Sequence, residues 1–131
     1  MEKRYVLVCV TGQRSCERLI AVGARHAREL GVALMVLHVA RTGARIMDYP
    51  GEAEALEYLY RKASEYGGDM TVVRADDVLD AIVLQARRVN AALIVTGRAA
   101  GYAGHDLLDD LAARLPDVPL KILRTNEGRE G

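Results

Sequence analysis

Apolar residues form five short continuous runs, and helical spacing fills the segments between them. The runs are Tyr5–Val10, Ala33–Val39, Met70–Arg74, Ala92–Thr96 and Leu120–Leu123. Runs that are apolar without alternation predict strands buried on both faces, as in a parallel sheet. Strands alternating with helices then predict an α/β fold: a doubly wound five-stranded parallel sheet.

Spacings of three and four residues predict four helices. The first runs from about Arg14 to Leu30, with Leu19, Ile20, Gly23, Ala27 and Leu30 on its core face. The second is marked by Leu56, Leu59, Tyr60 and Ala63, the third by Leu79, Ile82, Ala86 and Val89, and the fourth by Leu107, Leu108, Leu111 and Leu115. Asp76 or Asp77 is expected to cap the third helix.

The length of 131 residues fits one domain, expected over residues 1–125 with a frayed tail at 126–131. Two glycines and Pro50 make Arg41–Gly51 a loop, the segment expected to be most flexible.

Ligands of such sheets bind beyond the carboxyl ends of the strands, where the strand order reverses. The loops Thr11–Ser15 and Gly97–Gly104 follow the first and fourth predicted strands. The candidate binding residues are Val10, Thr11, Gly12, Ser15, Val39, Gly97, Arg98, Gly101 and Gly104. The three glycines of the second loop either leave N–H groups free to cradle a phosphate or serve a turn that requires positive φ. Arg98 either pairs with a phosphate or is a solvated charge.

Charge and composition restrict the classes of partner that this chain is expected to bind. Lys and Arg total 18 and balance 18 acidic residues, and the chain has no Trp or Phe, which disfavours nucleic acid. No apolar run approaches the roughly 20 residues that span a bilayer, so we expect no membrane contact from this chain. Cys9 and Cys16 are expected to be reduced thiols of a cytoplasmic protein. Cys9 is assigned to the core, and Cys16 is either core or a reactive thiol near a helix start.

No pattern of catalytic or metal-binding residues stands out. His26, His38 and His105 lie far apart, and no spacing among them, the cysteines and the acids suits a metal. His38 either lines the cleft or makes a structural hydrogen bond. Arg14, Arg18 and Arg25 form a stripe that either docks an acidic partner or is a solvated face. The sequence therefore predicts a protein that is not an enzyme and needs no metal.

Two segments carry a family resemblance. The segment VLVCVTGQRSCERLIAVGARHARELGVALMVLHV resembles the universal stress protein-like domain of KdpD potassium-sensor histidine kinases. The segment RADDVLDAIVLQARRVNAALIVTG resembles the general universal stress protein pattern of strand, acidic turn, helix and a strand ending in glycine. Together the similarity covers about residues 4 to 124.

The resemblance implies strand order 3-2-1-4-5, related to the adenine nucleotide α-hydrolase and Rossmann-like folds, and often a homodimer. Many members bind ATP through an aspartate after the first strand and a Gly-x2-Gly-x9-Gly-Ser/Thr motif after the fourth. Here Thr11 and Gly12 replace the aspartate, and Arg114 and Leu115 follow the nine-residue spacer after Gly104. Asp106, Asp109 and Asp110 suit a helix N-terminus and also repel a triphosphate. ATP is therefore expected to bind weakly or not at all, and no cofactor is required.

The leading functional hypothesis is a non-catalytic regulatory or sensory module. It acts through dimerisation, partner contact or weak ligand binding, on its own or as part of a potassium-sensing kinase. The alternatives are an ATP-binding universal stress protein and, third, an enzyme of the adenine nucleotide α-hydrolase superfamily. Strand order 3-2-1-4-5 would leave the fifth strand as an edge, so Leu120, Lys121, Ile122 and Leu123 are the candidate dimer contact.

Overall fold

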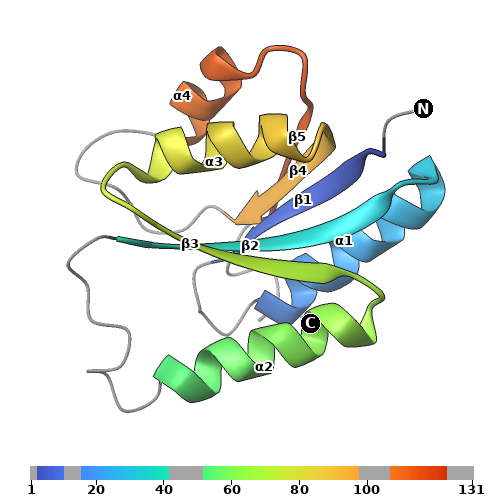
Figure 1. Ribbon diagram of the computed structural model, residues 1–131. Coiled ribbons are helices and arrows are strands. Elements are labelled where there is room, and N and C mark those ends of the chain that lie inside the picture. Colours follow the sequence, from blue (N-terminus) through green and yellow to red (C-terminus); the bar gives the residue numbers. More distant parts are fainter. Residues whose placement is uncertain (1–2, 11–15, 42–51, 98–106, 124–131) are drawn as a thin grey trace.

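All five strands belong to one parallel sheet. The computed structural model describes residues 3–10, 16–41, 52–97 and 107–123. The strands are β1 (Tyr5–Val10), β2 (Ala33–Arg41), β3 (Asp69–Ala75), β4 (Ala91–Gly97) and β5 (Leu120–Leu123). Their order is β3-β2-β1-β4-β5, which confirms the predicted fold and puts β1 centrally between β2 and β4 (Figure 1).

Two helices cover each face of the sheet. The helices α1 (Cys16–Leu30) and α2 (Glu52–Glu65) lie on one face, and α3 (Val78–Arg88) and α4 (Leu107–Arg114) on the other (Figure 1). The expected start of the first helix near Arg14 lies outside the described residues. So does the loop at 42–51, while Arg41 itself ends β2.

The core has two halves because side chains of a strand alternate between faces. Val6, Val8 and Val10 of β1 pack on the side of α1 and α2. Leu7 and Cys9 pack on the side of α3 and α4. Cys16 belongs to the α1–α2 half, so the sheet separates it from Cys9, and the two buried thiols form no disulfide.

The capping residue predicted for the third helix is confirmed, whereas one residue predicted for the core is exposed. The side chain of Asp77 caps α3 by accepting a hydrogen bond from the N–H of Asp80 at 3.1 Å. One core assignment is wrong: Leu30 is 53% exposed. It is the last residue of α1, and Gly31, with a φ of 72°, turns the chain away there, so no further helical turn shields it.

Candidate functional site

The strand order reverses between β1 and β4. From β1 the chain proceeds outward through β2 to β3, whereas from β4 it proceeds to β5 on the other side. In register, Cys9 pairs with Thr96 and Val10 pairs with His38. The carboxyl ends of β2, β1 and β4 therefore lie side by side, at the edge where open α/β sheets bind ligands.

Three of the candidate residues lie at this edge. Val10 is buried on the α1–α2 side, Val39 is half-buried on the α3–α4 side, and Gly97 ends β4. The remaining candidates, Thr11, Gly12, Ser15, Arg98, Gly101 and Gly104, lie outside the described residues. The described part of the site therefore consists of the carboxyl ends of β1, β2 and β4.

Gly97 does not need to be glycine for backbone reasons. Its φ is not in the left-handed region. An added Cβ would lie 3.7 Å from the carbonyl oxygen of Leu123 and 3.8 Å from Cδ1 of Leu19, which are ordinary contacts. At Gly97 this finding excludes the alternative of a turn that requires positive φ.

The polar side chains at these strand ends bind backbone carbonyls. The Nδ1 atom of His38 lies 3.2 Å from the carbonyl oxygen of Val10, so the imidazole links β2 to β1. The hydroxyl of Thr96 lies 3.5 Å from the carbonyl oxygen of Gly97, a long contact. The structural hydrogen bond expected of His38 is confirmed, and the same residue also lies at the ligand edge.

The structure locates the two residues that stand in the place of the Gly-Ser/Thr pair of the ATP motif. Arg114 ends α4, and Leu115 follows it. Both line a pocket with Asn90 and Ala91, at the amino end of β4. Anions are favoured at the N-terminus of a helix, so Arg114 and Leu115, at the C-terminal end of α4, are not placed to contact a phosphate bound there.

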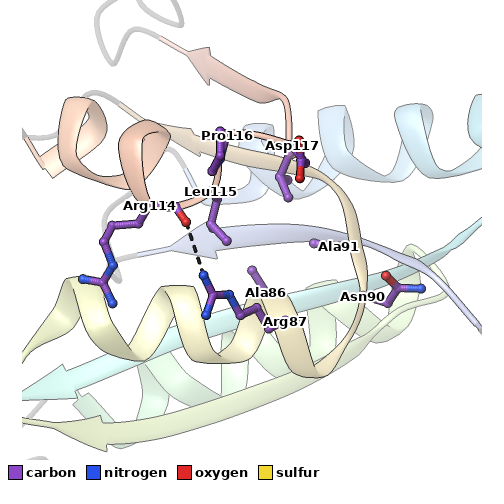
Figure 2. A pocket seen from close by; sticks show the side chains of 9 residues that line it. Ala86, Arg87, Asn90, Ala91, Arg114, Leu115, Pro116 and Asp117 are labelled. Atoms are coloured by element: carbon purple, nitrogen blue, oxygen red, sulfur yellow. Dashed lines mark hydrogen bonds between the residues drawn. The ribbon is translucent and has the colours of Figure 1, made fainter.

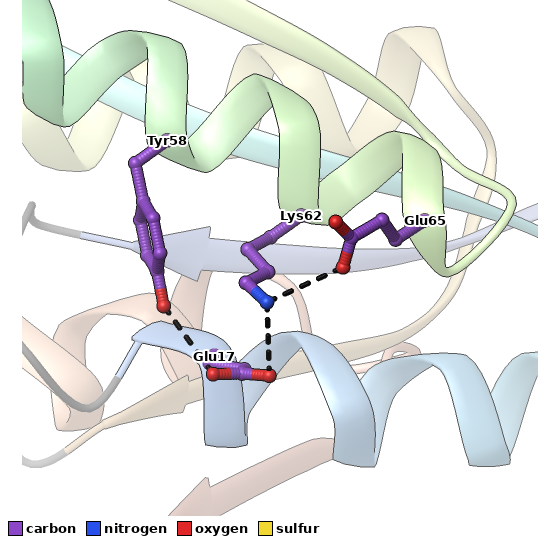
Figure 3. A network of polar contacts seen from close by, with 4 residues as sticks. All are labelled: Glu17, Tyr58, Lys62 and Glu65. Carbon is purple, nitrogen blue, oxygen red and sulfur yellow. Dashed lines mark hydrogen bonds and ion pairs between the residues drawn. The ribbon is translucent and has the colours of Figure 1, made fainter.

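A polar network joins the first turn of α1 to α2 (Figure 3). Lys62 Nζ lies 3.3 Å from Glu17 Oε2 and 3.3 Å from Glu65 Oε1, and the Tyr58 hydroxyl donates to Glu17 Oε1 at 3.3 Å. Burial and the adjacent Glu17 carboxylate raise the pKa of Tyr58. Hydrogen bonds to Glu65 and Glu17 raise the pKa of Lys62. No local pattern indicates this network, because Tyr58 and Glu17 are 41 residues apart in the chain.

A pocket of about 280 Å³ lies at the other end of the sheet (Figure 2). Two cations of its lining are already engaged: Arg87 Nη2 donates to the carbonyl of Arg114 at 3.4 Å, and Arg114 pairs with Asp80 at 2.9 Å. The C-terminal ends of α3 and α4 meet here, and their partial negative charge favours such cations without any ligand. The contacts of Arg87 and Arg114 therefore need no ligand in this pocket.

The described residues contain neither a cluster of metal ligands nor a helix that could span a membrane. Across 3–10, 16–41, 52–97 and 107–123, no three His, Cys, Asp or Glu side chains are grouped as metal ligands would be. In the same part of the chain, no helix has the length and apolarity needed to cross a bilayer.

Comparison with known proteins gives the family. The universal stress protein family matches residues 3–125, and the chain belongs to that family. A search of curated proteins found no match.

Solved structures show the same fold. A universal stress protein from Archaeoglobus fulgidus superposes with a TM-score of 0.68 at 22% identity, covering 93% of this chain and 94% of that one. An Archaeoglobus fulgidus universal stress protein in complex with dAMP gives 0.67 at 22% identity, with coverage of 93% and 98%. A universal stress protein in complex with cAMP gives 0.64 at 19% identity, with coverage of 95% and 98%.

Proposed function

We propose that this chain is a non-catalytic regulatory module that binds a small adenine nucleotide at the carboxyl ends of β1, β2 and β4. The observation that carries the proposal is the reversal of strand order between β1 and β4. Two universal stress proteins of the same fold are complexes with dAMP and with cAMP, which motivates the choice of ligand.

The chemistry of the strand ends supports binding rather than catalysis. In the described part of the edge, the side chains of His38 and Thr96 contact backbone carbonyls. A general base or nucleophile would instead be paired with another reactive side chain. In the described part of the edge, no such pair of reactive side chains supports the alternative of an enzyme of the adenine nucleotide α-hydrolase superfamily.

Charge favours a ligand with few phosphates. Asp109 and Asp110 are exposed in the first turn of α4, the helix that follows β4. Their carboxylates oppose the favourable field of the helix N-terminus for an anion, and the repulsion grows with ligand charge. Thr11 and Gly12 also replace the aspartate found in many ATP-binding members. We therefore infer that AMP binds more tightly than Mg·ATP.

The module is proposed to act in the cytoplasm as a homodimer, on its own or within a potassium-sensor kinase of the KdpD type. Among the described strands, the edge strand β5 pairs with β4 alone, and we propose that its other side pairs with a second copy. In this proposal, ligand binding regulates a protein partner through the dimer, and the chain itself catalyses no reaction.

Calorimetry with AMP and with Mg·ATP, at equal protein concentration and ionic strength, tests the binding proposal. The expected result is measurable AMP binding and weaker ATP binding, with unchanged nucleotide recovered after prolonged incubation. Tighter ATP binding would favour the alternative of an ATP-binding universal stress protein. Hydrolysis of either nucleotide would contradict a non-catalytic module.

A further inference from the structure

The first turn of α1 adjoins the edge of the sheet where the strand order reverses. Val10, the last residue of β1, and Cys16, the first of α1, are buried in the same half of the core. A Cβ added at Gly97, the last residue of β4, would lie 3.8 Å from Cδ1 of Leu19 in α1. Glu17 belongs to this first turn, so the helix brings a carboxylate to the neighbourhood of the ends of β1 and β4.

A carboxylate at this place has two opposite effects. Negative charge in the first turn of a helix is stabilising, which accounts for Glu17 on structural grounds. The same charge repels an anion bound at the neighbouring strand ends, because the screening length at ordinary ionic strength is about 10 Å. A nucleotide phosphate would therefore meet an unfavourable field unless the carboxylate is neutralised.

Lys62 of α2 supplies the neutralising charge (Figure 3). Its ammonium lies 3.3 Å from Glu17 Oε2 and 5.6 Å from the centre of the Tyr58 ring, and the Tyr58 hydroxyl donates to Glu17 Oε1. The Lys62 side chain is 20% exposed, so water screens this pair less than it screens an ion pair on an open surface. Glu65, the last residue of α2, shares the same ammonium at 3.3 Å.

We propose that Lys62 is a specificity-determining residue of the site: by neutralising Glu17 across the α1–α2 contact, it permits an anionic ligand at the ends of β1 and β4. This inference rests on the proposed function and adds to it a residue that lies outside the strand ends. The effect is one of charge, so it is the same whichever ligand atoms the strand ends contact. Lys62 thereby sets how strongly the site distinguishes a nucleotide from the uncharged nucleoside.

Lys62→Met tests the proposal, because it removes the charge and keeps an unbranched side chain beside the Tyr58 ring. The Tyr58 hydroxyl can still donate to Glu17, so α1 and α2 remain linked. At low ionic strength, calorimetry should show AMP affinity reduced about fourfold, the effect of one charge on a phosphate of roughly two charges about 10 Å away in water. Adenosine, which carries no charge, should bind the variant and the wild type equally.

Two further variants separate charge from packing. When Glu17→Gln is combined with Lys62→Met, both charges are gone, and AMP affinity should return to the wild-type value. Glu65→Gln is the matched control, because Lys62 keeps its contact with Glu17, and it should not weaken AMP binding. At about 1 M salt the difference between Lys62→Met and the wild type should disappear, since the screening length falls to roughly 3 Å.

The comparison of AMP with adenosine decides between a charge effect and a purely structural one. Equal losses of AMP and adenosine affinity in Lys62→Met would show that Lys62 acts through packing. Unchanged AMP affinity in that variant, or a double variant as weak as Lys62→Met, would show that the Glu17 charge does not act on the ligand. Each of these results would overturn this inference alone, whereas failure of the wild type to bind AMP would overturn the proposed function and this inference with it.

Discussion

Gly23 of α1 lies directly against Val8 of β1, and the contact leaves no room for a side chain. A Cβ added at Gly23 would clash with Cγ2 of Val8, which is fully buried in the α1–α2 half of the core. Val8 is β-branched and enclosed, so it cannot rotate away cheaply. Because the residue is glycine, α1 can approach the central strand closely.

The first prediction concerns this contact. Gly23→Ala should lower the free energy of unfolding in urea by about 1–3 kcal/mol, because overpacking outweighs the roughly 1 kcal/mol that alanine gains in a helix. Gly97→Ala is the control, since its Cβ meets only ordinary contacts, and its stability should stay the same or rise by up to about 1 kcal/mol. A Gly23→Ala variant as stable as the wild type would show that the helix sits farther from β1.

The second prediction concerns alkaline stability. Burial raises the pKa of the Cys9 thiol from 9.0 to about 12. Because the folded-state pKa is the higher one, the unfolded chain binds fewer protons between these values. Stability is therefore fully present below pH 9 and is lost as the pH rises towards 12, at up to about 1.4 kcal/mol per pH unit from this group.

Cys9→Ala removes that titrating group. Its free energy of unfolding should be lower at neutral pH, because a buried side chain is shortened, but it should fall less steeply with rising pH. Urea titrations across the alkaline range, with reductant present, measure both slopes. Identical slopes for the variant and the wild type would mean that Cys9 ionises as easily in the folded chain as in the unfolded one.

The third prediction separates the two carboxylates of the α1–α2 network. Glu17 contributes to the raised pKa of Tyr58, after burial, whereas Glu65 pairs with Lys62 and is not among the causes of that shift. Glu17→Gln should therefore lower the phenol pKa of Tyr58 towards its usual value, and Glu65→Gln should not. Ultraviolet difference titrations against the wild type resolve this change. A Tyr58 pKa that responds equally to both variants would contradict the contacts in Figure 3.

The fourth prediction concerns the open side of β5. Ile94 pairs with Leu120 and donates its N–H to the Pro119 carbonyl at 3.0 Å, so alternation along the strand turns the N–H of Ile122 away from β4. Ile122→Pro removes that outward donor and should convert the proposed dimer into a folded monomer in light scattering.

Lys121→Ala is the companion variant at the same edge. It removes an exposed charge that opposes pairing with another chain, so it should strengthen the dimer. A wild-type chain that is monomeric at high concentration, or an Ile122→Pro variant that stays dimeric, would rule out association through β5.

The sheet was predictable because its signals are local. A continuous apolar run such as Tyr5–Val10 indicates a buried strand, and Asp77 before an amphipathic segment indicates a helix start. The order β3-β2-β1-β4-β5 followed from the family resemblance, not from the runs themselves.

The site was less predictable because it depends on register and on contacts between distant residues. The role of His38 follows from its pairing with Val10, 28 residues away, which no local pattern specifies. The motif spacing put Arg114 and Leu115 in the place of the Gly-Ser/Thr pair, but a count of residues does not say where a helix begins or ends. The bounds of α4, Leu107–Arg114, show that Arg114 lies at the C-terminal end of the helix.

The central claim is that an adenine nucleotide binds at the carboxyl ends of β1, β2 and β4, and amide NMR of the wild type during titration with AMP tests it most directly. The account predicts saturable shifts at Val10, His38, Val39 and Gly97, with the amides of Arg87 and Asn90 beside the opposite pocket unchanged. Shifts confined to that pocket, or no saturable shift at any amide, would contradict the account.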